Sequence, residues 1–339
     1  SEGDAATLKT LTDDNNNNVY TATITDAIAS VANINTINAI TDGTLTINST
    51  TVTGSYSDLN TLYSNKVGTA GLGGEDFTVS GTITVAEANA LDDHTTGAIT
   101  ATISEEDAAT LIGLTDDNAN NVLTISLTDA TVDAANLNTI NGITAGTFTV
   151  SSTTVNGAAG AIHTAYTAGG ITGLGNETVT ATSGTLTVTQ ANAVDDATSG
   201  VITATISTGD ATTLKTLTDD NSNNVYTATI TDASVSVSDI NTINAITDGT
   251  LTINSNTVTG SYGDLNTLYS SKAGTAGLAD EAFTVSGTIT VTEANALDDH
   301  TTGAITATIS TGDATTLKTL TDDNSNNVYT ATITDASVS

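Results

Sequence analysis

Two hydrophobic periods alternate along this chain of 339 residues. In one, apolar residues alternate with threonine, as where Ile99, Ala101 and Ile103 share one face of an extended segment. A period of two predicts a strand with one buried and one wet face. In the other, apolar residues stand three apart, as at Leu59 and Leu62. That spacing predicts a single short helical or 3₁₀ turn packed on one face.

The predicted turns recur along the chain. Within the first part they align at Leu8, Ile37, Leu62, Leu91 and Leu111. An acidic or amide residue opens each turn, at Asp4, Asn33, Asp58 and Glu87. Asp or Asn in this place is expected to cap the turn. Corners between strands are expected at Thr25-Asp26, Asn48-Ser49 and Ser80-Gly81. A unit of about 26 residues cannot bury its own apolar face and must stack on its neighbours.

A longer repeat contains these units. The text that begins at Ser1 returns at Ser104, Ser207 and Ser310, a period of 103 residues. We therefore divide the chain into repeat 1 (1–103), repeat 2 (104–206, the most divergent), repeat 3 (207–309) and a partial repeat 4 (310–339). Because the last segment stops inside a repeat, we expect this sequence to be one part of a longer array of repeats.

Stacked units of this kind predict a mainly β fold. We expect a parallel β-solenoid with coils of about 26 residues, each made of strand, corner, strand and short helical turn, and four coils in each 103-residue repeat. The alternative is a series of tandem immunoglobulin-like β-sandwiches, because 103 residues is also a common size for such a domain. The fourfold internal repeat favours the solenoid.

Charge narrows the classes of partner. Thirty-eight acidic residues face five lysines, for a net charge of −33. Such a chain is repelled by nucleic acid and by anionic membrane surfaces, and the absence of a run of about 18 apolar residues argues against membrane insertion. Cysteine, methionine and proline are all absent. This composition suits a long-lived polymer outside the cell.

A loop rich in carboxylates and amides follows the first helical turn of each repeat. Closely spaced Asp and Asn oxygens suit Ca²⁺, which takes six to eight oxygen ligands. The alternative is a turn in which these side chains bond nearby backbone, with stacked amides between coils. The candidate Ca²⁺ ligands are Asp13, Asp14 and Asn16, then Asp116, Asp117 and Asn118, then Asp219, Asp220 and Asn221, and finally Asp322, Asp323 and Asn324.

A second acidic pair follows the fourth helical turn. It reads Asp92-Asp93-His94 in repeat 1 and Asp298-Asp299-His300 in repeat 3, but Asp195-Asp196-Ala197 in repeat 2. Histidine beside carboxylates raises a metal or acid/base interpretation, and a solvated loop is the alternative. Almost every polar group recurs 103 residues later, whereas an enzyme needs one asymmetric constellation. We therefore predict no catalytic activity.

Pairs of threonines raise one more possibility. The pairs Thr21/Thr23, Thr44/Thr46, Thr82/Thr84 and Thr100/Thr102 would form hydroxyl arrays if the coils stack in register, a surface that resembles those of ice-binding solenoids. Threonine is also simply a good residue for the wet face of a strand. Ice binding is a remote alternative.

The sequences of three segments are similar to those of a known group of proteins. Val291–Leu297, Gly303–Ile309 and Asp239–Ile246 resemble the repeats of giant secreted cell-surface and adhesin-type proteins of marine cyanobacteria and other aquatic bacteria. The resemblance covers nearly the whole chain. It implies an extracellular, often calcium-dependent structural role in surface layers, adhesion or motility, and supplies no catalytic residue.

The expected function is that of an extracellular structural repeat in a surface fibre, filament or matrix, stabilised by Ca²⁺ and assembled by self-association. The alternative is the stalk or the ligand-binding repeats of a giant adhesin that attaches to a cell surface or to a surface polysaccharide.

Overall fold

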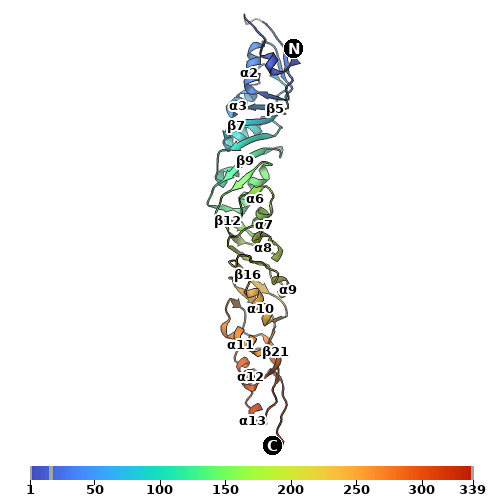
Figure 1. Cartoon of the computed structure of the whole chain (residues 1–339), viewed down its shortest axis with the longest axis vertical. Coiled ribbons are helices and arrows are strands. Elements are labelled where there is room, and N and C mark those ends of the chain that lie inside the picture. Colours follow the sequence, from blue (N-terminus) through green and yellow to red (C-terminus); the bar gives the residue numbers. More distant parts are fainter. Residues whose placement is uncertain (1, 15–17, 337–339) are drawn as a thin grey trace. The chain divides into compact units, whose positions relative to one another are not determined.

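The computed structural model describes residues 2–14 and 18–336 (Figure 1). The chain divides into two compact units. Unit 1 comprises Ser1–Asn156 and Thr164–Leu174, and unit 2 comprises Gly157–His163 and Gly175–Ser339. The predicted ligand Asn16 lies outside the described residues.

Short strands and helices alternate through both units. Repeat 1 contains β1 (Glu2–Gly3), α1 (Ala5–Leu8), β2 (Ala22–Ile24), β3 (Ile28–Ser30), α2 (Val31–Ile40), β4 (Leu45–Ile47), β5 (Thr51–Gly54), α3 (Tyr56–Asn65), β6 (Thr69–Ala70), β7 (Asp76–Ile83), α4 (Val85–Asp92) and β8 (Ile99–Ile103). Repeat 2 contains α5 (Ala108–Leu111), β9 (Val122–Leu127), β10 (Thr131–Asp133), α6 (Ala134–Ile143), β11 (Phe148–Val150), β12 (Thr154–Ala158), α7 (Ala159–Thr167), β13 (Ile171–Thr172), β14 (Thr178–Ser183), α8 (Val188–Asp195) and β15 (Ile202–Thr205).

The same order continues in the last part of the chain. Repeat 3 contains α9 (Ala211–Leu214), β16 (Val225–Ile230), β17 (Ser234–Ser236), α10 (Val237–Asn244), β18 (Leu251–Ile253), β19 (Thr257–Gly260), α11 (Tyr262–Ser271), β20 (Thr275–Ala276), β21 (Ala282–Ile289), α12 (Val291–Asp298) and β22 (Ile305–Ile309). The partial repeat contains α13 (Ala314–Leu317) and β23 (Val328–Thr330).

The strands form parallel sheets. In unit 1 the orders are β1-β2-β4-β6 and β13-β11-β9-β8-β7-β5-β3, and in unit 2 they include β14-β15-β16-β18-β20 and β17-β19-β21-β22-β23. Partners along a ladder lie 22 or 23 residues apart in these two examples, Ala22↔Leu45 and Phe77↔Ile99. Immunoglobulin-like sandwiches are antiparallel, so the parallel pairing shows that the predicted sandwich alternative is wrong.

Strand β9 joins two ladders. Its first half pairs with β8 through Thr100↔Val122, and its second half pairs with β11 through Phe148↔Ile125. Strand β16 does the same in unit 2, where it pairs first with β15 and then with β18. In repeats 2 and 3, one long strand therefore belongs to two ladders, the first through its first half and the second through its second half.

The helices are longer than the predicted single turns. Only α1, α5, α9 and α13 have four residues, whereas α2, α3 and α6 have ten and α4, α8 and α12 have eight. The chain is therefore mixed α/β rather than mainly β. Most of the longer helices of repeat 1 begin with Ser or Thr three residues before the predicted cap, and the acidic or amide residue then occupies the third helical position.

Helix α4 shows how the longer helices are capped. The Thr84 side chain accepts the backbone N–H of Glu87, and the Glu87 carboxylate accepts the N–H of Thr84, which is a capping box. Ser30 and Ser55 likewise cap α2 and α3. Among the three predicted caps of repeat 1, Asp4, Asn33 and Asp58, Asp4 alone holds that position, because it accepts the N–H of Thr7 at 2.8 Å.

The core is aliphatic, as the composition requires. Ile, Leu, Val and Ala fill the inward positions, together with Phe77, Phe148, Phe283 and Tyr226, each at most 2% exposed. The corner predicted at Ser80-Gly81 is instead a bulge inside β7, where the register shifts and Gly81 has a φ of 82°. The corners at Thr25-Asp26 and Asn48-Ser49 do separate consecutive strands.

Candidate functional site

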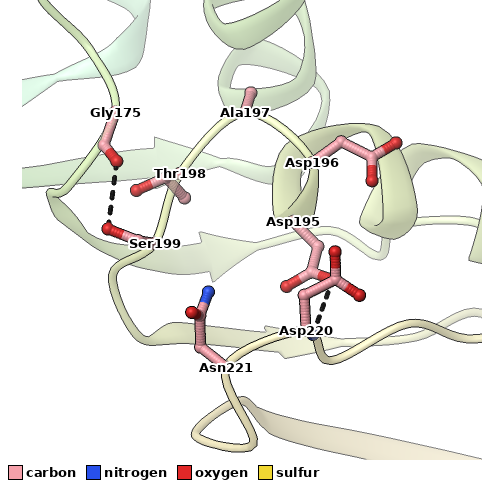
Figure 2. Close-up of a pocket in the computed structure, with 8 residues that line it drawn as sticks. All are labelled: Gly175, Asp195, Asp196, Ala197, Thr198, Ser199, Asp220 and Asn221. Carbon is pink, nitrogen blue, oxygen red and sulfur yellow. Dashed lines mark hydrogen bonds between the residues drawn. The ribbon is translucent and has the colours of Figure 1, made fainter.

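Two of the acidic motifs found in the sequence meet in one pocket (Figure 2). Helix α8 ends at Asp195, and the loop after α9, about 25 residues later, brings Asp220 and Asn221 to the same place. The pocket has a volume of about 370 Å³. Its lining includes Gly175, Asp195, Asp196, Ser199, Asp220 and Asn221.

Asp195 is the buried member of this group, only 4% exposed. Its carboxylate accepts the Asn224 side-chain N–H at 2.7 Å and the Asp220 backbone N–H at 3.3 Å, the second of which Figure 2 shows. The Asn224 side-chain oxygen in turn accepts the N–H of Ile202 at 2.9 Å. One buried amide thus ties the loop to a strand and to a helix end.

This arrangement recurs along the chain. The equivalent carboxylate, amide and backbone N–H belong to Asp92, Asn121 and Asp117 and, again, to Asp298, Asn327 and Asp323. The pocket itself returns at Asp298, with a volume of about 350 Å³. The recurrence marks a structural unit of the repeat rather than a single site.

The first Asp of each predicted Ca²⁺ loop forms a turn. The Asp219 carboxylate accepts the N–H groups of Asn223 at 3.0 Å and Asn224 at 3.1 Å. Asp116 and Asp322 make the equivalent bonds, and Asp13 accepts the backbone and side-chain N–H of Asn18. These are the contacts expected for the turn alternative.

The remaining predicted ligands lie toward the surface. Asp14, Asp117, Asn118, Asp220, Asn221, Asp323 and Asn324 are exposed or half-buried. Within residues 2–14 and 18–336, no group of three or more His, Cys, Asp or Glu side chains is placed to hold a metal ion. Ca²⁺ binding by these loops stays a prediction.

The histidines follow a pattern of exchange. His94 bonds the side-chain oxygen of Asn60 at 2.9 Å, and the equivalent pair in repeat 3 lies at 3.0 Å. In repeat 2, Ala197 stands where the others have histidine, and His163 stands 103 residues after Asn60. Repeat 2 thus has its histidine at the position that Asn60 occupies in repeat 1, and an alanine at the position of His94.

Sequence reasoning missed a buried tyrosine and glutamate pair. The Tyr63 hydroxyl donates to Glu75 at 2.8 Å, and the backbone N–H of Gly73 donates to the same carboxylate oxygen at 2.8 Å. The Tyr63 ring meets Phe77 edge-on, with centroids 4.6 Å apart. Burial, and then the neighbouring Glu75, raise the pKa of the tyrosine. The only sequence signal is the recurrence of the pair as Tyr269 and Glu281.

Other carboxylates hold the ends of neighbouring helices. Asp26 accepts the N–H of Ala5 at 2.6 Å, 21 residues earlier in the chain. Asp129, Asp232 and Asp335 do the same for α5, α9 and α13. The cap residue of α9 is Asp210, and hydrogen bonds from Thr213, first from its backbone N–H, hold the pKa of Asp210 below its usual 3.8. Much of the acidity therefore satisfies helix N-termini.

Two grooves lined by hydroxyl groups lie where strands meet the starts of helices. One has a volume of about 330 Å³ and the other, 206 residues later, about 310 Å³. The first is lined by Ser30, Thr53, Ser55, Asp58, Thr78 and Ser80. Of the predicted threonine pairs, Thr23 lies opposite Thr46, and Thr82 opposite Thr102. Thr84 leaves the array because it caps α4.

Comparisons with known proteins add no assignment. No family model, no curated protein and no solved structure matches the chain. The part of the chain that the structure describes has no helix long and apolar enough to cross a membrane.

Proposed function

We propose that this chain is a stretch of an extracellular structural protein, a parallel β-solenoid that spans distance within a surface fibre, filament or matrix. One observation carries the proposal: the buried polar side chains join one unit of the repeat to the next. Asn121 joins the loop after α5 to Asp92 and Ile99 of the preceding units. Polar groups used in this way stabilise an array.

The same observation supports a role without catalysis. Asp92, Asp195 and Asp298 are 5%, 4% and 7% exposed, and each accepts an asparagine side chain and a backbone N–H. A general acid, base or nucleophile needs an open face toward a substrate. These carboxylates accept hydrogen bonds from their own chain, although Asp195 and Asp298 also line pockets.

Length measures the solenoid directly. Four coils at about 4.8 Å each would add ~19 Å per repeat. Small-angle scattering from chains of one, two, three and four repeats should therefore give a maximum dimension that rises linearly by about that amount. A dimension that grows by about 35 Å or more per repeat, as expected for separate globular domains on a string, would reject the solenoid.

We propose Ca²⁺ as the stabilising ion of the exposed carboxylates. With a net charge of −33, the folded chain repels itself, and bound cations relieve that repulsion. Thermal unfolding with millimolar CaCl₂ should show a higher midpoint than with NaCl of equal ionic strength. The matched variant Asp196→Asn/Asp220→Asn should lose part of the rise. Equal midpoints in the two salts would exclude a calcium role.

A second candidate function, attachment to a polysaccharide as an adhesin repeat, is favoured by the two hydroxyl-lined grooves. Each joins several hydroxyl groups to one carboxylate, Asp58 or Asp264, and this combination suits the hydroxyl groups of a sugar. Titration calorimetry with soluble neutral oligosaccharides should then give two equivalent sites per chain. Asp58→Ala/Asp264→Ala should abolish them, and heats equal to buffer dilution would discard this function.

A further inference from the structure

One face of the sheets carries little charge although the chain as a whole is strongly acidic. In unit 1 its threonines are Thr78, Thr82, Thr100, Thr102 and Thr124 on β7, β8 and β9, all of them exposed, and Val122 lies exposed opposite Thr100. The equivalent residues of unit 2 are Thr284, Thr288, Thr306, Thr308 and Thr330 on β21, β22 and β23, also exposed. We call each set a threonine face.

The threonines of each face lie in register. Thr78 pairs with Thr100, and Thr82 pairs with Thr102 and then Thr124. In unit 2 the pairs Thr284↔Thr306 and Thr288↔Thr308↔Thr330 repeat the pattern. Neighbouring strands lie about 4.8 Å apart, so hydroxyl and methyl groups form ordered rows.

Most of the charges lie elsewhere. In repeat 1 most acidic side chains occupy helices and loops, such as Glu87 on α4 and Asp93 after it. Asp58 on α3 lines the groove that Thr78 also lines, so it stands at one end of the threonine face. Asp76 and Glu106 border the threonine face of unit 1, where Asp76 accepts the N–H of Ala98. In unit 2 the residues at those two border positions are Ala282 and Gly312. The face of unit 2 is therefore the more nearly neutral.

We propose that the threonine face is where two copies of this chain pack against each other, face to face. The inference rests on the proposed function as part of a fibre, and it names the lateral contact of that fibre. Chains with a net charge of −33 repel one another, so close approach costs least where neither partner carries charge. A hydroxyl group both donates and accepts hydrogen bonds, so a threonine face is chemically complementary to itself.

Repetition strengthens the contact. Two sheets pack face to face about 10 Å apart, with side chains of both inner faces interdigitating. One threonine face is a small surface, but each chain presents more than one. Once the first pair has docked, the next pair meets at a high effective concentration. A longer array should therefore associate much more tightly than a single repeat.

Sedimentation equilibrium in about 0.5 M NaCl, where the screening length is ~4 Å, tests the proposal. The wild-type chain should associate reversibly. Thr102→Asp/Thr308→Asp should weaken the association at least tenfold. The control Ala109→Asp/Thr315→Asp adds the same charge at equivalent exposed positions of the short helices α5 and α13, and should change it less than twofold. Circular dichroism verifies that both variants fold.

Three outcomes would overturn the inference. Equal weakening by both variants would mean that association responds only to net charge. A wild-type chain that stays monomeric would remove the lateral contact, while the increase in length per repeat would still stand as the test of the proposed function. A monomeric chain that binds insoluble neutral polysaccharide, and loses binding in Thr102→Asp/Thr308→Asp, would assign the face to a glycan instead.

Discussion

Two sides of the repeat differ in how buried their polar groups are. The loop side holds the asparagine and aspartate pairs, such as Asn121 and Asp92, and the strand face is the threonine face described above. On the loop side, Asn121 and Asp92 are at most 5% exposed and bond across units. On the strand face, Thr100 and Thr102 are exposed, and the backbone ladder joins the strands beneath them. We therefore expect substitutions on the loop side to cost more stability than substitutions on the strand face.

The largest difference should come from the buried amide. Asn121→Leu removes the partner of the Asp92 carboxylate and of the Ile99 N–H. A buried carboxylate that loses a donor is costly, and we expect a loss of about 3 kcal/mol in the free energy of unfolding. Urea denaturation measures it. Thr124→Ala, on the strand face of the same β9, is the control and should change stability by less than about 0.5 kcal/mol. Equal losses in the two variants would refute the distinction between the sides.

A smaller loss is expected where neighbouring stretches of backbone approach closely. A Cβ atom on Gly146 would collide with the carbonyl oxygen of Leu123 on the neighbouring strand. Gly146→Ala should therefore shift backbone and cost about 2 kcal/mol. Gly142→Ala, in helix α6, meets nothing within 4 Å and should stabilise the helix instead. Thermal unfolding of both variants gives the comparison, and a stable Gly146→Ala chain would argue against the close approach.

Alkaline pH should lower the stability of the fold through the buried tyrosines Tyr63 and Tyr269. Burial raises the pKa of Tyr63 and Tyr269 above the usual 10, so between pH 10 and their raised values the folded chain holds protons that the unfolded chain has lost. Stability is full below pH 10 and falls as pH rises, by up to about 1.4 kcal/mol per tyrosine at pH 11. Tyr63→Phe/Tyr269→Phe should flatten the pH dependence in urea denaturation. An unchanged slope would mean that these tyrosines ionise freely.

The smallest effect concerns the end of the strand face. Thr84 lies just beyond β7 and caps α4, so Thr84→Ala should cost about 1 kcal/mol. Ser80→Ala, four residues earlier on the exposed bulge, should cost almost nothing. Urea midpoints distinguish the two. If Ser80→Ala costs as much as Thr84→Ala, the cap has no special role.

Local patterns in the sequence predicted much of this architecture. The alternation of Ile99, Ala101 and Ile103 with threonine predicted the inward face of β8, and the 103-residue period predicted that every element returns. Helix lengths were missed because Asn33 and Asp58 looked like caps, although each is the third residue of its helix. The pattern could not distinguish the two positions, since both favour polar residues.

Longer-range features were beyond reach for a physical reason. Val122–Leu127 has the alternation of an ordinary strand, and its division between two ladders depends on which strands arrive beside it. Asp195 and Asp196 are adjacent and chemically identical, yet one is buried and the other exposed. Asp195 lies on the buried face of α8 with Val194, and its partner there, Asn224, comes 29 residues later in the chain.

The bond from Asp26 to Ala5 has a consequence for how the chain is made. The first turn of α1, which Asp4 already caps, receives its second carboxylate only after 21 more residues have been synthesised, and the same holds for α5, α9 and α13. On a ribosome, each unit therefore stays unfinished until its successor has emerged. Folding should advance from the amino end one step behind synthesis, with a single incomplete unit travelling along the growing chain.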